Sequence, residues 1–151
     1  MKTLSNLSDR REISLRLAEL SPTDVARWGL MSVHQMVCHL DDSYEVACGN
    51  RTVSPATSLI QRTIVKWFAL NTPMQWPRGV PTRPEIEQGK GGSIPGDFRQ
   101  DLASLLAAFA RFCDDSPNPP IRHPIFGNMT AANWMRWGYL HADHHLRQFG
   151  R

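Results

Sequence analysis

The amino-acid sequence predicts an all-α protein that forms one compact helical bundle. In several long segments apolar residues recur at intervals of three and four, which is the spacing of one helix face. No segment alternates apolar and polar residues convincingly, as a half-buried strand would, and no internal repeat is visible. A chain of 151 residues can bury a sizeable core in one ordinary domain, so we expect residues 1–151 to form a single domain.

The first helical region is predicted over about residues 9–28 and is expected to be short and broken. Ser21-Pro22-Thr23-Asp24 is a fresh start signal, with serine as the cap and proline in the first turn, and Gly29 ends the region. The next helix is better defined. Ser32-Val33-His34-Gln35 has the form of a capping box, and the apolar residues after it extend the helical spacing to near Gly49.

Ser54-Pro55 is predicted to open a third helix, whose apolar residues share one face until Asn71-Thr72-Pro73 ends it. Residues 71–97 then hold five prolines and five glycines without a period, which predicts a long Pro/Gly-rich loop. Loops of this length in a small domain often carry function, so we expect this one to cover part of a site.

Asp97 is predicted to cap a fourth helix with the cleanest apolar stripe of the chain, which places this helix at the centre of the core. The stripe comprises Phe98, Leu102, Leu105, Leu106, Phe109 and Phe112. A second loop is predicted from Asp114 to Met129 and contains Asn118-Pro119-Pro120. Thr130 then caps a final helix that runs to about Gln148.

Composition and charge argue against several classes of partner. The net charge is +3 and the pI near 9.0, but the basic residues are scattered, which gives little support for a nucleic-acid partner. No apolar run is long enough for a signal peptide or a membrane span, so we expect no membrane partner. The three cysteines show no CxxC spacing and are expected to be buried thiols in a cytoplasmic protein.

The final helix carries the motif with most chemical content, because His141 and His145 are one turn apart and can bind one metal ion from the same face. Gly138 on that face is expected to leave space beside them. The alternatives are a histidine-rich surface, or a pair satisfied inside the core beside Trp134 and Trp137.

A metal site of this kind usually takes three or four protein ligands, so a third ligand must come from another segment. The second helix offers His34 and His39. They are five residues apart, or roughly 140° around the helix axis, so only one of them can reach the same ion. Each lies about 110° from the centre of the apolar face, on opposite flanks, so periodicity leaves both candidates open.

Two segments, Met31-Ser32-Val33-His34-Gln35-Met36-Val37-Cys38-His39-Leu40 and Trp137-Gly138-Tyr139-Leu140-His141-Ala142-Asp143-His144-His145-Leu146-Arg147-Gln148, resemble the DinB-like superfamily of metalloenzymes. The resemblance is to a branch known only as a domain of unknown function. The Trp76-Pro77 loop and the Phe126-Gly127…Thr130…Trp134 segment are also similar to this branch.

This resemblance implies a DinB-like four-helix bundle, preceded by the short N-terminal helical region, with His39, His141 and His145 as the metal ligands. Many DinB-like proteins continue the second histidine pair with Arg-Gly-Gln, whereas Leu146-Arg147-Gln148 follows here. Any role tied to that tail is therefore not carried over.

The function that the resemblance implies is that of a divalent-metal-dependent enzyme, with zinc or nickel as the expected ion. Three imidazoles leave a coordination position for a water or a low-molecular-weight thiol, which the ion would activate for transfer, isomerisation or hydrolysis of a small molecule. Superfamily relatives include thiol-dependent S-transferases and a maleylpyruvate isomerase with a thiol cofactor. The alternative is a non-catalytic metal- or ligand-binding module, and no catalytic residue is assigned.

Partners for the second nitrogen of each histidine are expected among Asp41, Asp42, Asp143 and Gln148. A homodimer is expected through a second apolar strip on the final helix, formed by Met135, Tyr139 and Leu146; the alternative is that this strip is core.

The other aromatic, histidine and cysteine side chains are expected to have no chemical role. Those expected to fill the core are Trp28, Trp67, Trp134 and Trp137. No chemistry is assigned to His34, His123 and His144, and Cys38 is expected to be a poor nucleophile.

Overall fold

A computed structural model describes residues 1–56, 58–80, 82–115 and 122–151. Its elements in chain order are α1 (Leu7–Ala18), α2 (Val33–Ala47), the π-helix η1 (Gln61–Val65), α3 (Lys66–Asn71), the 3-10 helix η2 (Pro84–Ile86), α4 (Phe98–Asp115) and α5 (Ala131–Gln148). The described residues include no strand, so the all-α prediction is confirmed for them. The predicted loop segment Asn118-Pro119-Pro120 lies outside the described residues.

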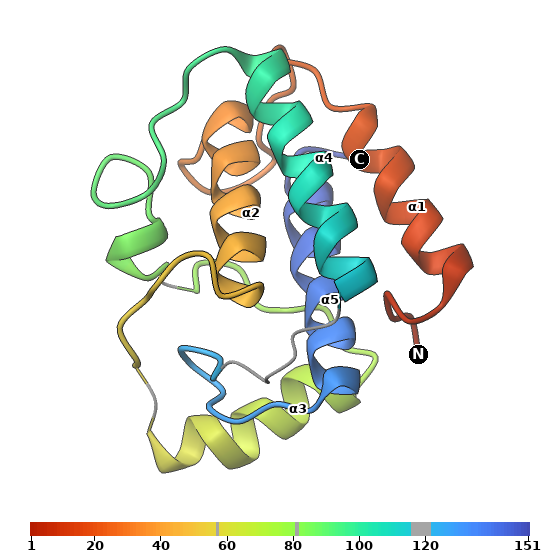
Figure 1. The fold of residues 1–151 in the computed structure, drawn as a ribbon, viewed down its shortest axis with the longest axis vertical. Helices are drawn as coiled ribbons and strands as arrows, with labels where there is room; N and C mark the ends of the chain where they lie inside the picture. The colour runs from red at the N-terminus through yellow and green to blue at the C-terminus, as the bar shows by residue number, and fades with distance from the viewer. Residues whose placement is uncertain (57, 81, 116–121) are drawn as a thin grey trace.

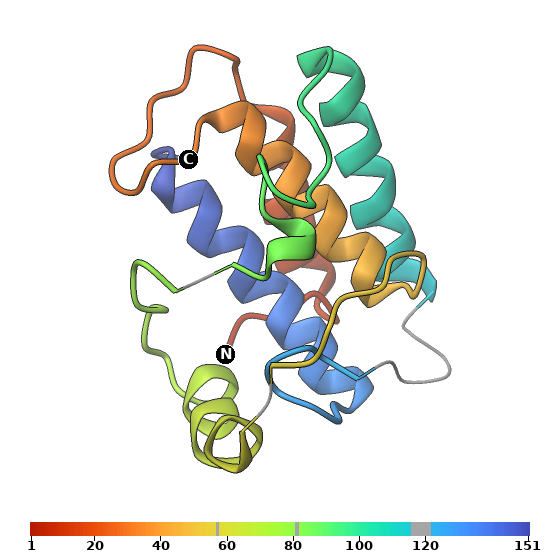
Figure 2. The same ribbon diagram turned by 90° about the vertical axis from the view of Figure 1, so that its left-hand side faces the viewer.

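The long helices surround a common interior (Figure 1). Helix α2 packs against α4 and α5, and α1 packs against the same two helices from the other side. Figure 2 shows η2 next to α2, with α3 below the lower end of the long helices. In the part of the chain that the structure describes, no helix combines the length and apolar character needed to cross a bilayer.

The predicted helix caps explain where three of these helices begin. Ser32 and Gln35 form the expected capping box at α2, with each side chain bonded to the other residue's backbone N–H. The Asp97 carboxylate accepts two backbone N–H bonds at the start of α4. Thr130 caps α5 in the same way, with Asn133 as the reciprocal partner. Side chains of this kind satisfy donors that the first turn leaves without helical acceptors.

The core lies between α2, α4 and α5 and is rich in aromatic rings. Phe112 on α4 is fully buried and packs against Tyr44 on α2, with ring centroids 5.1 Å apart. Gly138 on α5 allows this packing, because a Cβ there would lie 2.5 Å from Phe112 Cε1 and 2.9 Å from Leu4 Cδ1. The expectation that Gly138 leaves space beside the histidines is therefore wrong; the space at Gly138 is filled by Phe112 and Leu4.

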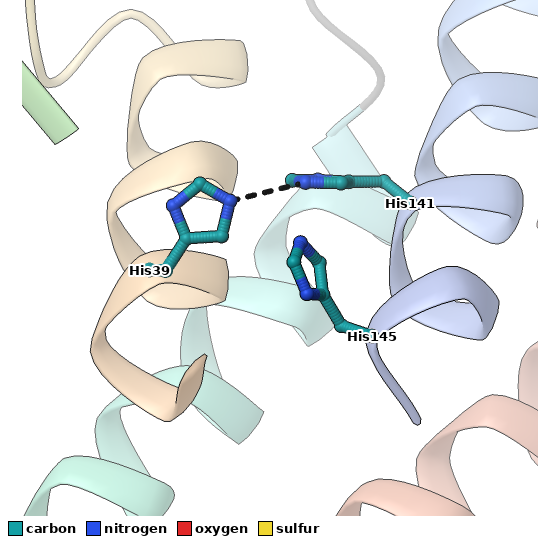
Figure 3. Close-up of side chains that lie close together, drawn as sticks. All are labelled: His39, His141 and His145. Carbon is teal, nitrogen blue, oxygen red and sulfur yellow. Dashed lines mark hydrogen bonds between the residues drawn. The ribbon is translucent and has the colours of Figure 1, made fainter. Parts of the chain in front are cut away.

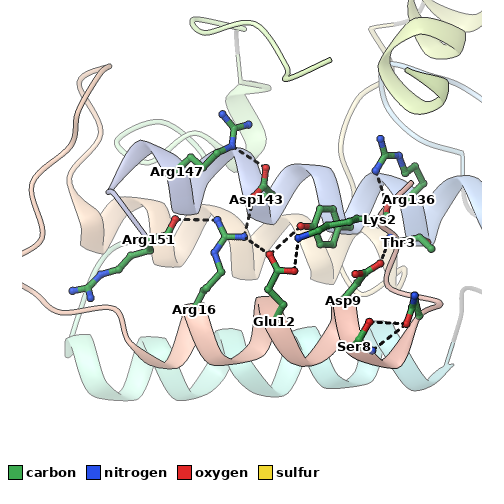
Figure 4. A network of polar contacts seen from close by, with 12 residues as sticks. Lys2, Thr3, Ser8, Asp9, Glu12, Arg16, Arg136, Asp143, Arg147 and Arg151 are labelled. Atoms are coloured by element: carbon green, nitrogen blue, oxygen red, sulfur yellow. Dashed lines mark hydrogen bonds and ion pairs between the residues drawn. The ribbon is translucent and has the colours of Figure 1, made fainter. Parts of the chain in front are cut away.

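Helix α1 covers the outer face of α5 through a polar network (Figure 4). The Arg16 guanidinium donates to the carboxylates of Glu12 on α1 and Asp143 on α5, and Tyr139 Oη donates to Glu12. The apolar strip of Met135, Tyr139 and Leu146 lies under this cover and is only 6%, 4% and 0% exposed. This strip is core, so the surface predicted for a homodimer is not available.

Two predicted helix boundaries are wrong. Residues 21–32 form no helix, because the Asp24 carboxylate accepts from the Ser21 backbone N–H and closes a turn, while also pairing with Arg151 at the other end of the chain. The third helical segment begins after Ser58, whose hydroxyl caps Gln61, and not at Ser54.

The apolar face of this third segment is exposed instead of buried. Trp67 and Phe68 retain 56% and 53% of their surface accessible, so Trp67 is not the core filler that was predicted. The other three tryptophans predicted as core fillers, Trp28, Trp134 and Trp137, are buried or partly buried. Apolar periodicity shows which side of a helix is apolar, but it does not show whether another element covers that side.

Candidate metal centre

Two helices bring three imidazoles together (Figure 3). His39 lies near the middle of α2 and faces α5, where His141 and His145 lie one turn apart on the facing side. The Nε2 atoms of His39 and His141 are 3.2 Å apart, and the centroid of the His145 ring is 4.9 Å from that of His39 and 5.0 Å from that of His141. One nitrogen from each ring lies within 4.8 Å of the other two. This spacing is compatible with a single ion bound by all three.

The structure also separates the two candidates that periodicity left open. His34 lies on the α4 side of α2, where its Nε2 is 2.6 Å from Asp101 Oδ2. His39 lies on the α5 side and is only 4% exposed. Only His39 can therefore join the pair on α5, which is the arrangement that the resemblance implied.

Hydrogen bonds at the second ring nitrogen orient two of the three imidazoles. His39 Nδ1 is 3.1 Å from the carbonyl oxygen of Ile86, and His145 Nδ1 is 3.0 Å from Gln148 Oε1. Both acceptors require a proton on Nδ1, which leaves the Nε2 lone pair directed at the cluster. Gln148 is held in this orientation because its amide nitrogen donates to the carbonyl oxygen of Trp28. Metal-binding histidines are usually oriented in this way.

His141 tests whether the cluster is satisfied without an ion. Its Nδ1 is buried and has no hydrogen-bond partner, while its Nε2 faces the Nε2 of His39. His39 Nε2 carries a lone pair, so two tautomers of His141 are possible. If Nε2 of His141 is protonated, it donates to His39 and leaves an unpaired lone pair on the buried Nδ1. If Nδ1 is protonated, the lone pairs of the two Nε2 atoms face each other. A cation shared by the two Nε2 atoms would remove the contact between their lone pairs and would leave the Nδ1–H of His141 without an acceptor, so the fit to a metal rests on the converging ring nitrogens and not on Nδ1.

Electrostatics keep these rings neutral. Burial lowers the pKa of His39, and burial together with the neighbouring imidazoles lowers the pKa values of His141 and His145 well below the usual value for histidine. Neutral imidazole is the form that binds metal, because protonation would occupy the coordinating lone pair. At neutral pH the three ligand nitrogens are therefore available.

Aromatic side chains enclose the cluster on the α5 side. The ring of Trp137 lies 5.0 Å from that of His141, and the ring of Trp76, from the segment between α3 and η2, lies 6.1 Å from it. The ring of His144 contacts those of Trp76 and Trp28 and lies 5.2 Å from that of His145. Apolar walls of this kind limit water access and strengthen interactions between charges inside the site.

The Ile86 carbonyl is positioned by a partly buried ion pair between Asp42 on α2 and Arg51. Asp42 on α2 is 2% exposed; it pairs with Arg51 and accepts from the backbone N–H and hydroxyl of Ser93. Arg51 in turn donates to the carbonyl oxygens of Glu85 and Gly91. These bonds attach residues 85–93 to α2, and therefore hold Ile86 against His39.

Of the four side chains expected to support the ligands, only Gln148 contacts one of the three histidines directly. Asp42 acts at a distance through the segment that carries Ile86, Asp143 pairs with Arg16 and Arg147, and Asp41 accepts from Ser104. The Ile86 carbonyl was missed, because a backbone acceptor 47 residues away in sequence has no side-chain signature.

Burial and the nearby Asp101 carboxylate raise the pKa of the Cys38 thiol to about 12, which agrees with its being a poor nucleophile. His123, for which no chemical role was expected, is part of the packed interior: it is 6% exposed, stacks on Phe126, and its Nδ1 accepts the backbone N–H groups of Ile125 and Phe126.

Comparison with known proteins gives one match. A family model described as "Protein of unknown function (DUF1569)" matches residues 3–151. No curated protein gives a significant match, and neither does any solved structure.

Proposed function

The chain belongs to the DUF1569 family of proteins of unknown function, and from its own histidine cluster we propose that it is a metal-dependent enzyme acting on a small molecule. In this proposal one divalent ion is held by His39, His141 and His145. The observation that carries the proposal is the convergence of three neutral imidazoles from two helices, with one nitrogen of each ring within 4.8 Å of the other two.

The donor set favours particular ions. Three imidazole nitrogens suit zinc or nickel far better than magnesium or calcium, which prefer oxygen ligands. A site with three protein ligands keeps at least one position open, as catalytic zinc sites do and closed structural sites do not. A divalent ion held in this way acts as a Lewis acid and lowers the pKa of a bound water or thiol.

The residues around the cluster have separate tasks in this proposal. Ile86 and Gln148 keep the Nε2 atoms of their histidines directed inward. Trp76 and Trp137 exclude bulk water from one side. The resemblance to the DinB-like superfamily, with its thiol-dependent transferases and isomerase, supports a low-molecular-weight thiol or water as the activated group.

Metal content of the untagged protein is the first test. We expect elemental analysis to find zinc or nickel in the wild-type protein, with one equivalent of it bound by the histidine cluster. His145→Ala should lose this ion and remain folded. His144→Ala is the matched control, since it removes the adjacent histidine of the same helix, which packs edge-on against the His145 ring but is not one of the three proposed ligands. A folded wild-type protein that binds zinc and nickel no better than His145→Ala would refute the site.

Activity is tested separately, by screening the metal-loaded protein for thiol conjugation and ester hydrolysis. We expect turnover that disappears in His145→Ala and survives in His144→Ala. Tight metal binding without turnover in this screen would instead identify a metal-binding module.

A further inference from the structure

A second cluster of metal-binding side chains lies on the opposite side of α2. His34 and Cys38 are four residues apart and therefore share the face of α2 that packs against α4. Asp101, in the first turns of α4, meets both: its Oδ2 is 2.6 Å from His34 Nε2 and 3.8 Å from Cys38 Sγ. One ligand atom from each of the three residues lies within 4.8 Å of the other two.

We propose that His34, Cys38 and Asp101 form a second divalent metal site, distinct from the histidine cluster and independent of it. The i, i+4 spacing on one helix with a third ligand from a neighbouring helix repeats the geometry of the first cluster. Cys38 and His39 are adjacent in sequence but roughly 100° apart around the axis of α2, so the two sites use different faces of that helix.

The chemistry of the ligands selects the ion. A thiolate and a carboxylate together neutralise a divalent cation, which reduces the cost of placing that charge in a largely buried position. A mixed set of imidazole, thiolate and carboxylate suits zinc or cobalt(II), whereas magnesium and calcium disfavour sulfur. Three protein ligands again leave a position open to solvent or to a further ligand.

Neighbouring groups hold these ligands in place. The backbone N–H of Gly96 donates to Asp101 Oδ2 at 2.9 Å, and the ring of Phe98 packs edge-on against His34 at a centroid distance of 5.3 Å. Cys38 is 4% exposed, whereas the side chains of His34 and Asp101 keep 23% and 28% of their surface accessible. An ion can therefore enter from solvent on the side of His34 and Asp101.

Cobalt(II) titration of the untagged, metal-free protein distinguishes the two sites, because only the second contains sulfur. We expect the wild-type protein to bind two equivalents and to develop the intense near-ultraviolet absorption of a thiolate bound to cobalt(II). His145→Ala should lose one equivalent and keep this absorption. Cys38→Ser should lose one equivalent and lose the absorption completely. Cys113→Ser is the matched control, since it replaces another buried cysteine on α4, and it should keep the absorption.

The outcomes separate this proposal from the previous one. Absence of the thiolate absorption in folded wild-type protein at saturating cobalt(II) would overturn the second site, and so would its persistence in Cys38→Ser. If Cys38→Ser fails to fold, Asp101→Asn provides the second variant, and we expect it to weaken cobalt(II) binding at the sulfur site at least tenfold. Unchanged affinity in Asp101→Asn would show that His34 and Asp101 form only an ion pair between α2 and α4. Failure of the histidine cluster alone would leave one equivalent, still accompanied by the thiolate absorption.

Discussion

Replacing Gln148 with methionine tests how far the histidine cluster depends on its supporting hydrogen bonds. Gln148 is 5% exposed and makes two bonds, from His145 Nδ1 at 3.0 Å and to the Trp28 carbonyl oxygen at 2.9 Å. Methionine has a similar length and fills the same space, but it offers His145 no strong acceptor. His145 would then be free to rotate or to adopt the other tautomer, either of which withdraws its Nε2 from the ion.

The size of the effect follows from the position of Gln148. Loss of one partner behind a metal-binding histidine typically weakens metal affinity about 10- to 100-fold. That range corresponds to about 1.4–2.7 kcal/mol of binding free energy at 25 °C. We expect the Gln148→Met variant to fall within it, because the Ile86 bond to His39 remains intact and only one of the three ligands loses its orientation.

Competition with a chromophoric zinc chelator measures this affinity directly. Gln148→Glu is the control: its carboxylate still accepts from His145 Nδ1 but can no longer donate to the Trp28 carbonyl. We expect Gln148→Glu to lose stability in urea denaturation yet bind zinc at least as tightly as the wild-type protein. If Gln148→Met folds and binds zinc with wild-type affinity, the orientation argument is wrong.

Three further predictions concern the scaffold around the site. Gly138→Ala should destabilise the metal-free protein by about 1 kcal/mol in urea denaturation. Overpacking against the fully buried Phe112 costs about 1–3 kcal/mol, and the higher helix propensity of alanine offsets about 1 kcal/mol of this cost. A variant more stable than the wild-type protein would contradict this packing. Burial lowers the pKa of His123 from 6.5 to about 3, so the unfolded state binds a proton that the folded state excludes, and stability falls as pH drops below 6.5. His123→Asn retains a hydrogen-bond acceptor but has no group that titrates in this range. Its free energy of unfolding should therefore fall less steeply between pH 6 and pH 4, by up to about 1.4 kcal/mol per pH unit. The same pH dependence in variant and wild type would show that His123 does not have a lowered pKa in the folded protein. Asp42→Ala should accelerate amide hydrogen exchange in residues 85–93 and leave α4 protected. It should also weaken zinc binding, because Ile86 is no longer held against His39. Equal protection of residues 85–93 in variant and wild type would show that the ion pair of Asp42 with Arg51 does not hold this segment.

Sequence reasoning worked where the physical cause is local. The caps at Ser32, Asp97 and Thr130 depend on side chains two or three residues from the groups they satisfy, so short motifs identify them. The apolar stripe of α4 is likewise a property of consecutive turns. The pairing of His141 with His145 belongs to the same class, because one helix fixes both positions.

Prediction failed where a distant segment decides the outcome. Ser21-Pro22 resembles a helix start, but Asp24 pairs with Arg151 at the far end of the chain and the segment forms a turn. The third helical segment has an apolar face, yet Trp67 on that face stays exposed. Residues that orient ligands through the backbone, such as Ile86, leave no pattern at all in the sequence.

The ambiguity between His34 and His39 has a physical explanation in the packing of α2. Two residues about 140° apart on one helix cannot serve one ion, but they can each face a different neighbouring helix. His39 meets the pair on α5, while His34 meets Asp101 on α4. The five-residue spacing excludes one of the two histidines from any shared ion. The same spacing lets α2, which lies between α4 and α5, present a polar side chain to each of these helices. Metal titrations that assign one ion to each face of α2 would establish this reading, and a single ion bound only at His39 would reduce His34 to a link between helices.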